Sequence, residues 1–129
     1  MKILIVDDDK TTRKLLGLYL KGKGYGTVTA ENGLDAMEKL SAGDINLIVT
    51  DMNMPYMDGI ELTRTLRSDA ASKNIPIIMV TTEADDDERK KALEAGVDDY
   101  LVKPTNADQI SDSIKAILKK FFSGGDGNV

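Results

Sequence analysis

The sequence predicts an α/β protein: a doubly wound, five-stranded parallel sheet of strand order 2-1-3-4-5, with helices on both faces. Three observations predict this fold. Short β-branched, apolar runs alternate with segments whose apolar residues recur at helical spacing. The first, third and fourth runs are continuously apolar, as expected of central parallel strands that helices cover on both sides. Repeated strand-helix units imply right-handed crossovers and place the functional crevice beyond the carboxyl ends of the strands.

The five runs are expected to form strands at residues 3–6, 27–30, 47–50, 77–81 and 100–102. Between and after them, three helices and a weaker one show apolar stripes that should face the sheet. These stripes are Leu15, Leu16, Leu18 and Tyr19; Leu34, Met37 and Leu40; Leu62 and Leu66; and Ile110, Ile114, Ile117, Leu118 and Phe121. The last helix follows Asn106 and Gln109, whose spacing is typical of a capping box.

The segment 85–95 carries acidic residues first and basic residues later, which suits the dipole of a helix. Leu93 is its only large apolar residue, so we expect this fourth helix to be loosely held. An ordinary solvated surface helix has the same pattern, and both interpretations stay open here.

The length, composition and net charge of the chain restrict its possible functions. The chain has 129 residues, enough for one domain, and 41% of them are hydrophobic and 30% charged, a balance typical of globular proteins. The absence of cysteine and histidine excludes disulfides, thiolate sites and histidine-based catalysis. A net charge of -5 without a basic stripe argues against nucleic-acid binding.

No apolar run approaches the ~20 residues that span a membrane. The apolar start reaches Asp7 too soon for a signal peptide, so we expect a cytoplasmic protein. We expect one domain over residues 1–122 and a flexible tail over 123–129, which is either a natural end or the start of a linker. No effector domain is visible, so the output should pass through contact with another protein.

Carboxylates follow two neighbouring strands of the predicted sheet. The first strand ends at Asp7, Asp8 and Asp9, and the third ends at Asp51. Carboxylates held close repel one another, whereas Mg²⁺ binds their oxygens readily and leaves room for a phosphate. Asp8 or Asp9 alone could equally cap the next helix. Together with Asp51 they favour a magnesium site in which Asp51 is a nucleophile toward phosphorus and Asn53 offers its backbone carbonyl.

Two more strand ends lead to the same edge. Thr81 ends the fourth strand and can donate a hydrogen bond to a phosphoryl oxygen, although it could be an ordinary strand residue. Lys103 follows the fifth strand and can neutralise phosphoryl oxygens, although a lysine before proline is usually a solvated turn residue. We interpret Pro55, Asp58 and Gly59 as loop punctuation.

With these residues in place, the sequence resembles the receiver domains of two-component response regulators, and among them the single-domain chemotaxis regulators, up to about residue 121. These domains have the flavodoxin-like (βα)5 fold. The resemblance rests on four motifs: Val6-Asp7-Asp8; Asp51-Met52-Asn53-Met54-Pro55 with Met57-Asp58-Gly59; Val80-Thr81 with Glu83-Ala84; and Tyr100-Leu101-Val102-Lys103-Pro104.

The resemblance implies a role for each site residue. Asp51 is the phosphoacceptor, and Asp8 and Asp51 bind Mg²⁺ directly. Asp7 acts through water, and Asn53 gives its carbonyl. Thr81 and Lys103 hold the phosphoryl oxygens, and the bond between Lys103 and Pro104 is cis.

The resemblance also implies a mechanism. A phosphohistidine on a kinase or phosphotransfer protein gives its phosphoryl group to Asp51, and the domain later hydrolyses the acyl phosphate. Thr81 then moves toward the phosphoryl group and Tyr100 turns inward. This changes the face made by the fourth helix, the fifth strand and the fifth helix, which binds a protein target. Such a domain is a switch that catalyses only its own phosphorylation and dephosphorylation, and it is a monomer whose dimerisation on phosphorylation stays open.

Three positions depart from the pattern. Asp9 replaces an aromatic residue and adds charge near the metal, Thr82 replaces a small residue and could narrow access to Asp51, and Thr105 replaces a frequent phenylalanine. Asn53 and Glu83 match residues that flank the path of the hydrolytic water, so we expect Asn53, Thr82 and Glu83 to tune hydrolysis and the phosphorylated state to be short-lived.

Three alternative functions fit the sequence less well. A haloacid-dehalogenase-type phosphatase needs a second aspartate two residues after the nucleophile, where Asn53 stands. A flavodoxin-like electron carrier needs a first loop rich in Ser, Thr and Gly, whereas Asp7, Asp8 and Asp9 would repel its phosphate. A docking module that is never phosphorylated would not need the acid, hydroxyl and lysine set.

Overall fold

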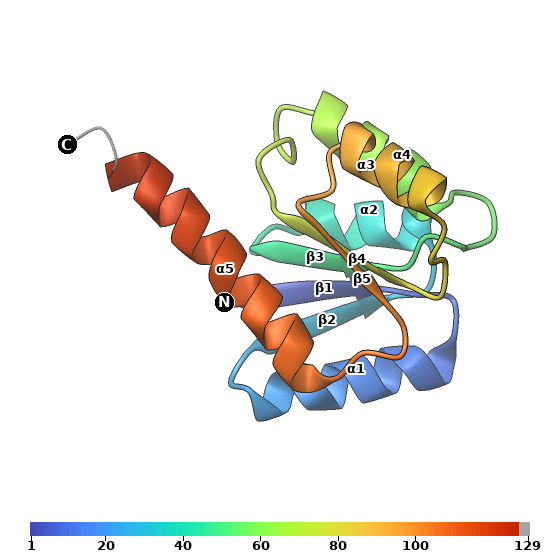
Figure 1. Cartoon of the computed structure of the whole chain (residues 1–129), viewed down its shortest axis with the longest axis horizontal. Helices are drawn as coiled ribbons and strands as arrows, with labels where there is room; N and C mark the ends of the chain where they lie inside the picture. The colour runs from blue at the N-terminus through green and yellow to red at the C-terminus, as the bar shows by residue number, and fades with distance from the viewer. Residues whose placement is uncertain (127–129) are drawn as a thin grey trace.

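The computed structural model of the chain describes residues 1–126, and it describes side-chain surroundings as far as residue 120. Five strands alternate with five helices (Figure 1). In order, the elements are β1 Lys2–Val6, α1 Lys10–Gly22, β2 Gly26–Ala30, α2 Gly33–Ser41, β3 Leu47–Thr50, α3 Gly59–Ser68, β4 Ile77–Thr81, α4 Asp86–Ala95, β5 Asp99–Val102 and α5 Ala107–Asp126. The strand bounds predicted from the apolar runs are confirmed to within one residue.

The sheet has the predicted order, β2-β1-β3-β4-β5, and all four pairings are parallel. In Figure 1, α1 lies below the sheet, α2, α3 and α4 lie above it, and α5 starts below the sheet and runs to the upper left; α1 and α5 pack against the same core. The register pairs Ile5 with Val49, and Val6 with Thr50. The carboxyl ends of β1 and β3 therefore lie at the same level at one edge of the sheet.

Side chains of the central strands alternate between two cores, because successive residues of a strand point to opposite faces. Leu4 and Ile48 belong to the core under α2, α3 and α4. Ile3 and Leu47 belong to the core under α1 and α5. All four side chains have no exposed surface, which explains why residues 3–6 of β1 and 47–49 of β3 are all apolar.

The predicted helix stripes are right for α3 and for Ile110 to Leu118 of α5, and they are partly wrong in the other helices. Phe121, the last residue of the predicted α5 stripe, lies outside the residues whose side-chain surroundings are described. In α1, the side chains buried against the sheet are Leu16 and Leu20, and Leu15, Leu18 and Tyr19 are between 43% and 57% exposed. The apolar residues of α1 extend around more of the helix than the sheet can cover, so pattern alone did not locate the buried half.

In α2 and α4, the smaller side chains lie closest to the sheet. Ala36 of α2 is fully buried, whereas Leu34 is 63% exposed. In α4, Ala92 is fully buried, and Leu93, the expected anchor, is 41% exposed. An alanine lets a helix approach its neighbours closely. Leu93 therefore contributes little to the core, and α4 packs through Ala92; that this helix is loosely held stays a prediction.

The start of α5 is capped as predicted. The Gln109 N–H donates to the Asn106 side chain at 2.8 Å, and the Asn106 N–H donates to the Gln109 side chain at 3.2 Å. The helix extends away from the sheet to Asp126 (Figure 1), four residues into the segment 123–129 expected to be a tail; residues 127–129 lie outside the described part of the chain. Within residues 1–126, no helix combines the length and the apolar character that a membrane span requires.

Candidate functional site

The backbone ladders of the sheet continue one residue past the strands and so position the site. The Asp7 N–H donates to the carbonyl of Ala30, the last residue of β2, at 3.1 Å, and the Asp51 N–H donates to the Val6 carbonyl at 2.9 Å. The Lys103 N–H donates to the Thr81 carbonyl at 2.7 Å. The backbones of Asp7, Asp51 and Lys103 are therefore each held by a hydrogen bond to the neighbouring strand.

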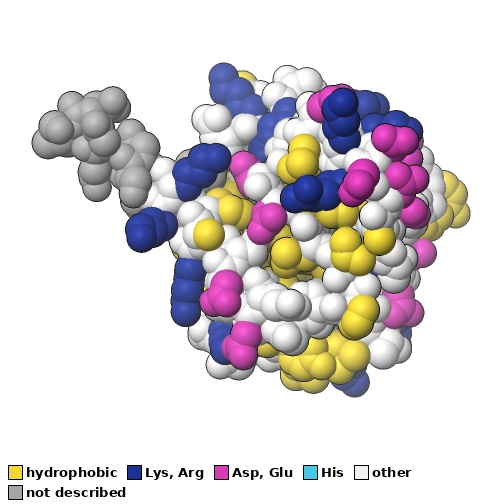
Figure 2. All heavy atoms as spheres, viewed as in Figure 1, with side chains coloured by type: hydrophobic (Ala, Val, Ile, Leu, Met, Phe, Trp, Pro, Cys, Tyr) yellow, Lys and Arg dark blue, Asp and Glu magenta, His cyan; other side chains and the backbone are white. Residues whose placement is uncertain are grey.

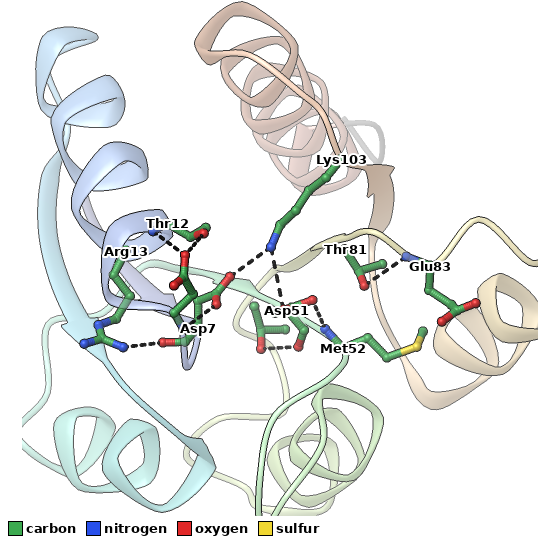
Figure 3. Close-up of polar contacts among 10 residues, drawn as sticks. Asp7, Thr12, Arg13, Asp51, Met52, Thr81, Glu83 and Lys103 are labelled. Carbon is green, nitrogen blue, oxygen red and sulfur yellow. Dashed lines mark hydrogen bonds and ion pairs between the residues drawn. The ribbon is translucent and has the colours of Figure 1, made fainter.

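Lys103 lies between two carboxylates from different strands (Figure 3). Its Nζ is 3.0 Å from Asp7 Oδ2 and 3.6 Å from Asp51 Oδ2. The side chains are 21% exposed for Lys103, 3% for Asp7 and 13% for Asp51, so these charges interact largely away from water. The peptide bond between Lys103 and Pro104 is cis, as the resemblance implies.

Three carboxylates form a cluster suited to a hard cation. One oxygen each from Asp7, Asp8 and Asp51 lies within 4.8 Å of the others, and Asp8 is exposed to solvent. Carboxylate oxygens converging from a buried side toward an open side fit Mg²⁺, which retains water ligands on its open side. Asn53 is exposed on the loop after Asp51, and its carbonyl as a further ligand stays a prediction.

Asp51 is electrostatically strained. Burial raises the pKa of its carboxyl, and the nearby charge of Asp7 raises it further. The Lys103 ammonium and the Met52 N–H, which donates to Asp51 Oδ1 at 2.7 Å, lower the pKa but do not cancel the rise. A bound cation would stabilise such a partly desolvated, only partly neutralised carboxylate, which could still act as a nucleophile.

Asp9 does not belong to the cluster. Its carboxylate caps α1 by accepting a hydrogen bond from the Thr12 N–H at 2.9 Å, and it also accepts one from the Thr12 hydroxyl. These two bonds are the main reason why its pKa is lowered. The capping role, weighed for Asp8 or Asp9, therefore belongs to Asp9.

Glu83 connects the two residues expected to form the switch. Its N–H donates to the Thr81 hydroxyl oxygen at 3.3 Å, and its carbonyl accepts from the Tyr100 hydroxyl at 2.7 Å. Tyr100 is only 6% exposed, so its ring already lies inward here, whereas the sequence led us to expect an inward turn on phosphorylation. Thr82, between Thr81 and Glu83, is exposed.

Gly59 has a role that sequence reasoning missed. It begins α3, and its N–H donates to the Met52 carbonyl at 2.7 Å. A Cβ atom there would lie 2.2 Å from the Asp51 carbonyl oxygen and 2.9 Å from Met79 Cε. Only glycine lets α3 begin this close to Asp51, so the interpretation as loop punctuation was incomplete. Asp58, by contrast, is the ordinary cap of α3.

Sequence reasoning also missed Arg13. Its Nη1 donates to the Asp7 carbonyl oxygen at 2.7 Å from the first turns of α1 (Figure 3). No motif in the sequence points to this contact, because it depends on how α1 folds back toward the end of β1.

Known proteins resemble this chain in sequence over most of its length. A family model described as the response regulator receiver domain matches residues 3–115. Chemotaxis protein CheY1 of Helicobacter pylori is 43% identical over 120 residues, which cover 92% of this chain and 97% of the relative. Chemotaxis protein CheY of Pseudomonas aeruginosa is 41% identical over 121 residues, or 93% of this chain and 98% of the relative.

Solved structures agree. Chemotaxis protein CheY4 of Vibrio cholerae has a TM-score of 0.84 and 31% identity, covering 89% of this chain and 96% of its own. A two-component response regulator from Clostridium difficile has a TM-score of 0.86 and 32% identity, covering 94% and 98%. The family match and these identities, together with the shared fold, show that this chain belongs to the response regulator receiver domain family.

Proposed function

We propose that this receiver domain accepts a phosphoryl group on Asp51 from a phosphohistidine of a sensor kinase or phosphotransfer protein. The observation that carries the proposal is the placement of Lys103 Nζ 3.0 Å from Asp7 and 3.6 Å from Asp51. One ammonium beside a buried, nucleophilic carboxylate is suited to neutralise the oxygens of a transferred phosphoryl group.

The chemistry requires little rearrangement of the site. An Asp51 oxygen attacks phosphorus, and the bond from phosphorus to the donor imidazole nitrogen breaks with its electron pair on that nitrogen. Asp8, Asp51 and the Asn53 carbonyl would hold a Mg²⁺ ion, with Asp7 acting through water. Such an ion would supply positive charge that offsets the charge of the phosphoryl oxygens. Lys103 neutralises a further oxygen. Water later attacks phosphorus, and the bond to Asp51 breaks, so the domain acts only on itself.

Thr81 and Tyr100 are the residues we propose to report phosphorylation. The Thr81 hydroxyl oxygen accepts from the Glu83 N–H, and its hydrogen can donate to a phosphoryl oxygen. The Glu83 segment and Tyr100 respond because hydrogen bonds connect Glu83 to both hydroxyls. Contacts made only with the phosphoryl group present shift the population of conformers.

The output is a protein contact on the face made by α4, β5 and α5, which lies toward the viewer in Figure 2. Acidic side chains gather over the first turn of α4, which carries Asp86, Asp87 and Glu88, and basic side chains lie along α5. Leu93 and Val102 add exposed apolar surface. The chemotaxis relatives favour a target in a chemotaxis pathway, and we expect the protein to act in the cytoplasm as a monomer that binds neither nucleic acid nor a membrane.

Intact-mass analysis tests the proposal. The protein and the variant Asp51→Asn are incubated with acetyl phosphate and Mg²⁺. We expect one phosphoryl group on the native chain and none on the variant. The proposal is lost if the native chain gains none or if the variant gains as much. Saturable turnover of a small phosphate ester would instead favour a phosphatase.

A further inference from the structure

In the turn that carries the candidate magnesium ligands, hydrogen bonds and an ion pair hold the carboxylates of Asp7 and Asp9. Asp7 Oδ1 accepts from the Asp9 N–H at 2.9 Å, and Asp7 Oδ2 is paired with Lys103. Asp9 is bound to Thr12. Among residues 1–120, by contrast, no hydrogen bond or ion pair holds the Asp8 side chain, so the backbone of the turn sets the position from which this side chain extends.

One side chain holds that backbone at the critical peptide unit. Arg13 Nη1 donates to the Asp7 carbonyl oxygen at 2.7 Å, a short, charge-assisted hydrogen bond. This oxygen belongs to the peptide unit that joins Asp7 to Asp8. Because a peptide unit is planar, a donor on its oxygen also sets the direction in which the Asp8 N–Cα bond leaves it.

The surroundings of Arg13 fit this task, and its charge also helps to lower the pKa values of Asp9 and Asp35. It is partly buried, its backbone N–H continues α1 by donating to the Asp9 carbonyl at 3.0 Å, and no carboxylate of the described residues lies within ion-pairing distance of it. A guanidinium has a rigid, planar fork of donors, so it can hold a carbonyl in a defined direction better than a flexible ammonium can.

We propose that Arg13 is a positioning residue of the magnesium site: it fixes the Asp7–Asp8 peptide so that the Asp8 carboxylate faces Asp51. This inference rests on the proposed function. It predicts the direction in which the Mg²⁺ affinity changes when the Arg13 side chain is removed. A positive charge beside a cation site opposes cation binding, so removing a mere charge would tighten Mg²⁺ binding. Removing a group that positions a metal ligand should instead weaken Mg²⁺ binding.

The test is calorimetric titration of the full chain with MgCl₂. We expect Arg13→Met to weaken Mg²⁺ binding about tenfold, as is usual for groups that orient metal ligands. Arg13→Lys should lie between that variant and the native protein, because an ammonium can donate to the carbonyl without the rigid fork. Lys14→Met is the matched control, because Lys14 is exposed on the same helix and its replacement also removes one positive charge. In this control, Mg²⁺ binding should stay equal or become slightly tighter.

Labelling by acetyl phosphate gives a second readout. In Arg13→Met, the Mg²⁺ concentration for half-maximal labelling should rise, and the rate at saturating Mg²⁺ should be retained. Thermal melting without Mg²⁺ shows whether each variant is folded, and Arg13→Lys serves if Arg13→Met is not. Equal or tighter binding by the folded Arg13 variants overturns the inference. A native protein that binds Mg²⁺ but gains no phosphoryl group overturns the proposed function instead.

Discussion

The Tyr100 hydroxyl donates a 2.7 Å hydrogen bond to the backbone carbonyl of Glu83. The N–H of the same residue donates to the Thr81 hydroxyl oxygen at 3.3 Å. A side chain on β5 is thereby linked, through one residue of the loop before α4, to a hydroxyl at the end of β4. The link passes through hydrogen bonds that a small displacement of the loop can break or form.

Tyr100→Phe tests this link. The variant retains the ring but leaves the Glu83 carbonyl without its donor, so we expect the free energy of unfolding to fall by about 1 kcal/mol. Urea denaturation measures it, with Tyr19→Phe, at a 43% exposed position, as the matched control that should change little. Labelling of Asp51 should continue, because the change removes no group from the phosphoacceptor site. An unchanged unfolding midpoint for Tyr100→Phe would show that the hydrogen bond contributes nothing.

Gly59→Ala should be far more disruptive than its size suggests. The new Cβ would lie 2.2 Å from the Asp51 carbonyl oxygen, and backbone cannot rotate aside as a flexible side chain can. We expect a loss of about 3 kcal/mol in the free energy of unfolding and slower labelling of Asp51. Gly22→Ala is the control, because a Cβ there meets nothing within 4 Å and should be neutral or slightly stabilising. Similar unfolding curves for the two variants would contradict the packing argument.

Lys103→Met should destabilise the protein when Mg²⁺ is absent. It leaves the largely buried carboxylates of Asp7 and Asp51 facing each other without a cation, at an expected loss of about 3 kcal/mol. Added Mg²⁺ should restore part of that stability. Chemical denaturation with and without MgCl₂ measures both effects. Lys91→Met, which removes only an exposed pair with Glu88, should change little, and equal losses in the two variants would refute this reasoning.

Asp51→Asn should raise the melting temperature in the absence of Mg²⁺. The pKa of Asp51 is raised by burial and by Asp7, so the ionised carboxylate is less favourable in the folded chain than in the unfolded chain. The stability that Asp51 contributes is therefore present below the ordinary carboxyl pKa and is lost as the pH rises through the raised one.

The gain from Asp51→Asn should consequently be largest near neutral pH and should shrink as the pH falls toward roughly 4. Mg²⁺ should stabilise the native chain more than the variant, since it binds the ionised carboxylate. Melting curves between pH 4 and pH 7 measure both effects. A gain that stays constant over this range would exclude the ionisation of Asp51 as its cause.

The lifetime of the phosphorylated state should be short, because Asn53 and Glu83 match residues that flank the path of the hydrolytic water in related receivers. Thr82, exposed between Thr81 and Glu83, should slow water access, so Thr82→Ala should shorten the lifetime further. Intact-mass analysis after removal of acetyl phosphate follows the decay. A half-life of many hours at room temperature, or a slower decay in Thr82→Ala, would disagree with this prediction.

The strands and their order could be predicted from the sequence because their signals are local. A short, continuous apolar run rich in β-branched residues, such as residues 77–81, is typical of a strand that helices cover on both faces. The cap of α5 by Asn106 and Gln109 is equally local, since the residues are three apart. The residues at the strand ends then followed from the topology, which places parallel carboxyl ends at one edge.

The sequence by itself determined which residues reach the site, and only the tertiary structure decided how they are held there. Arg13 bound to the Asp7 carbonyl, Gly59 against the Asp51 backbone and Glu83 between Thr81 and Tyr100 are all contacts to backbone groups. The packing of α1 against the sheet likewise decided which of its side chains are buried, namely Leu16 and not Leu15. Every residue carries the same backbone groups, so no side-chain pattern announces such contacts, and they exist only once the helices have packed against the sheet.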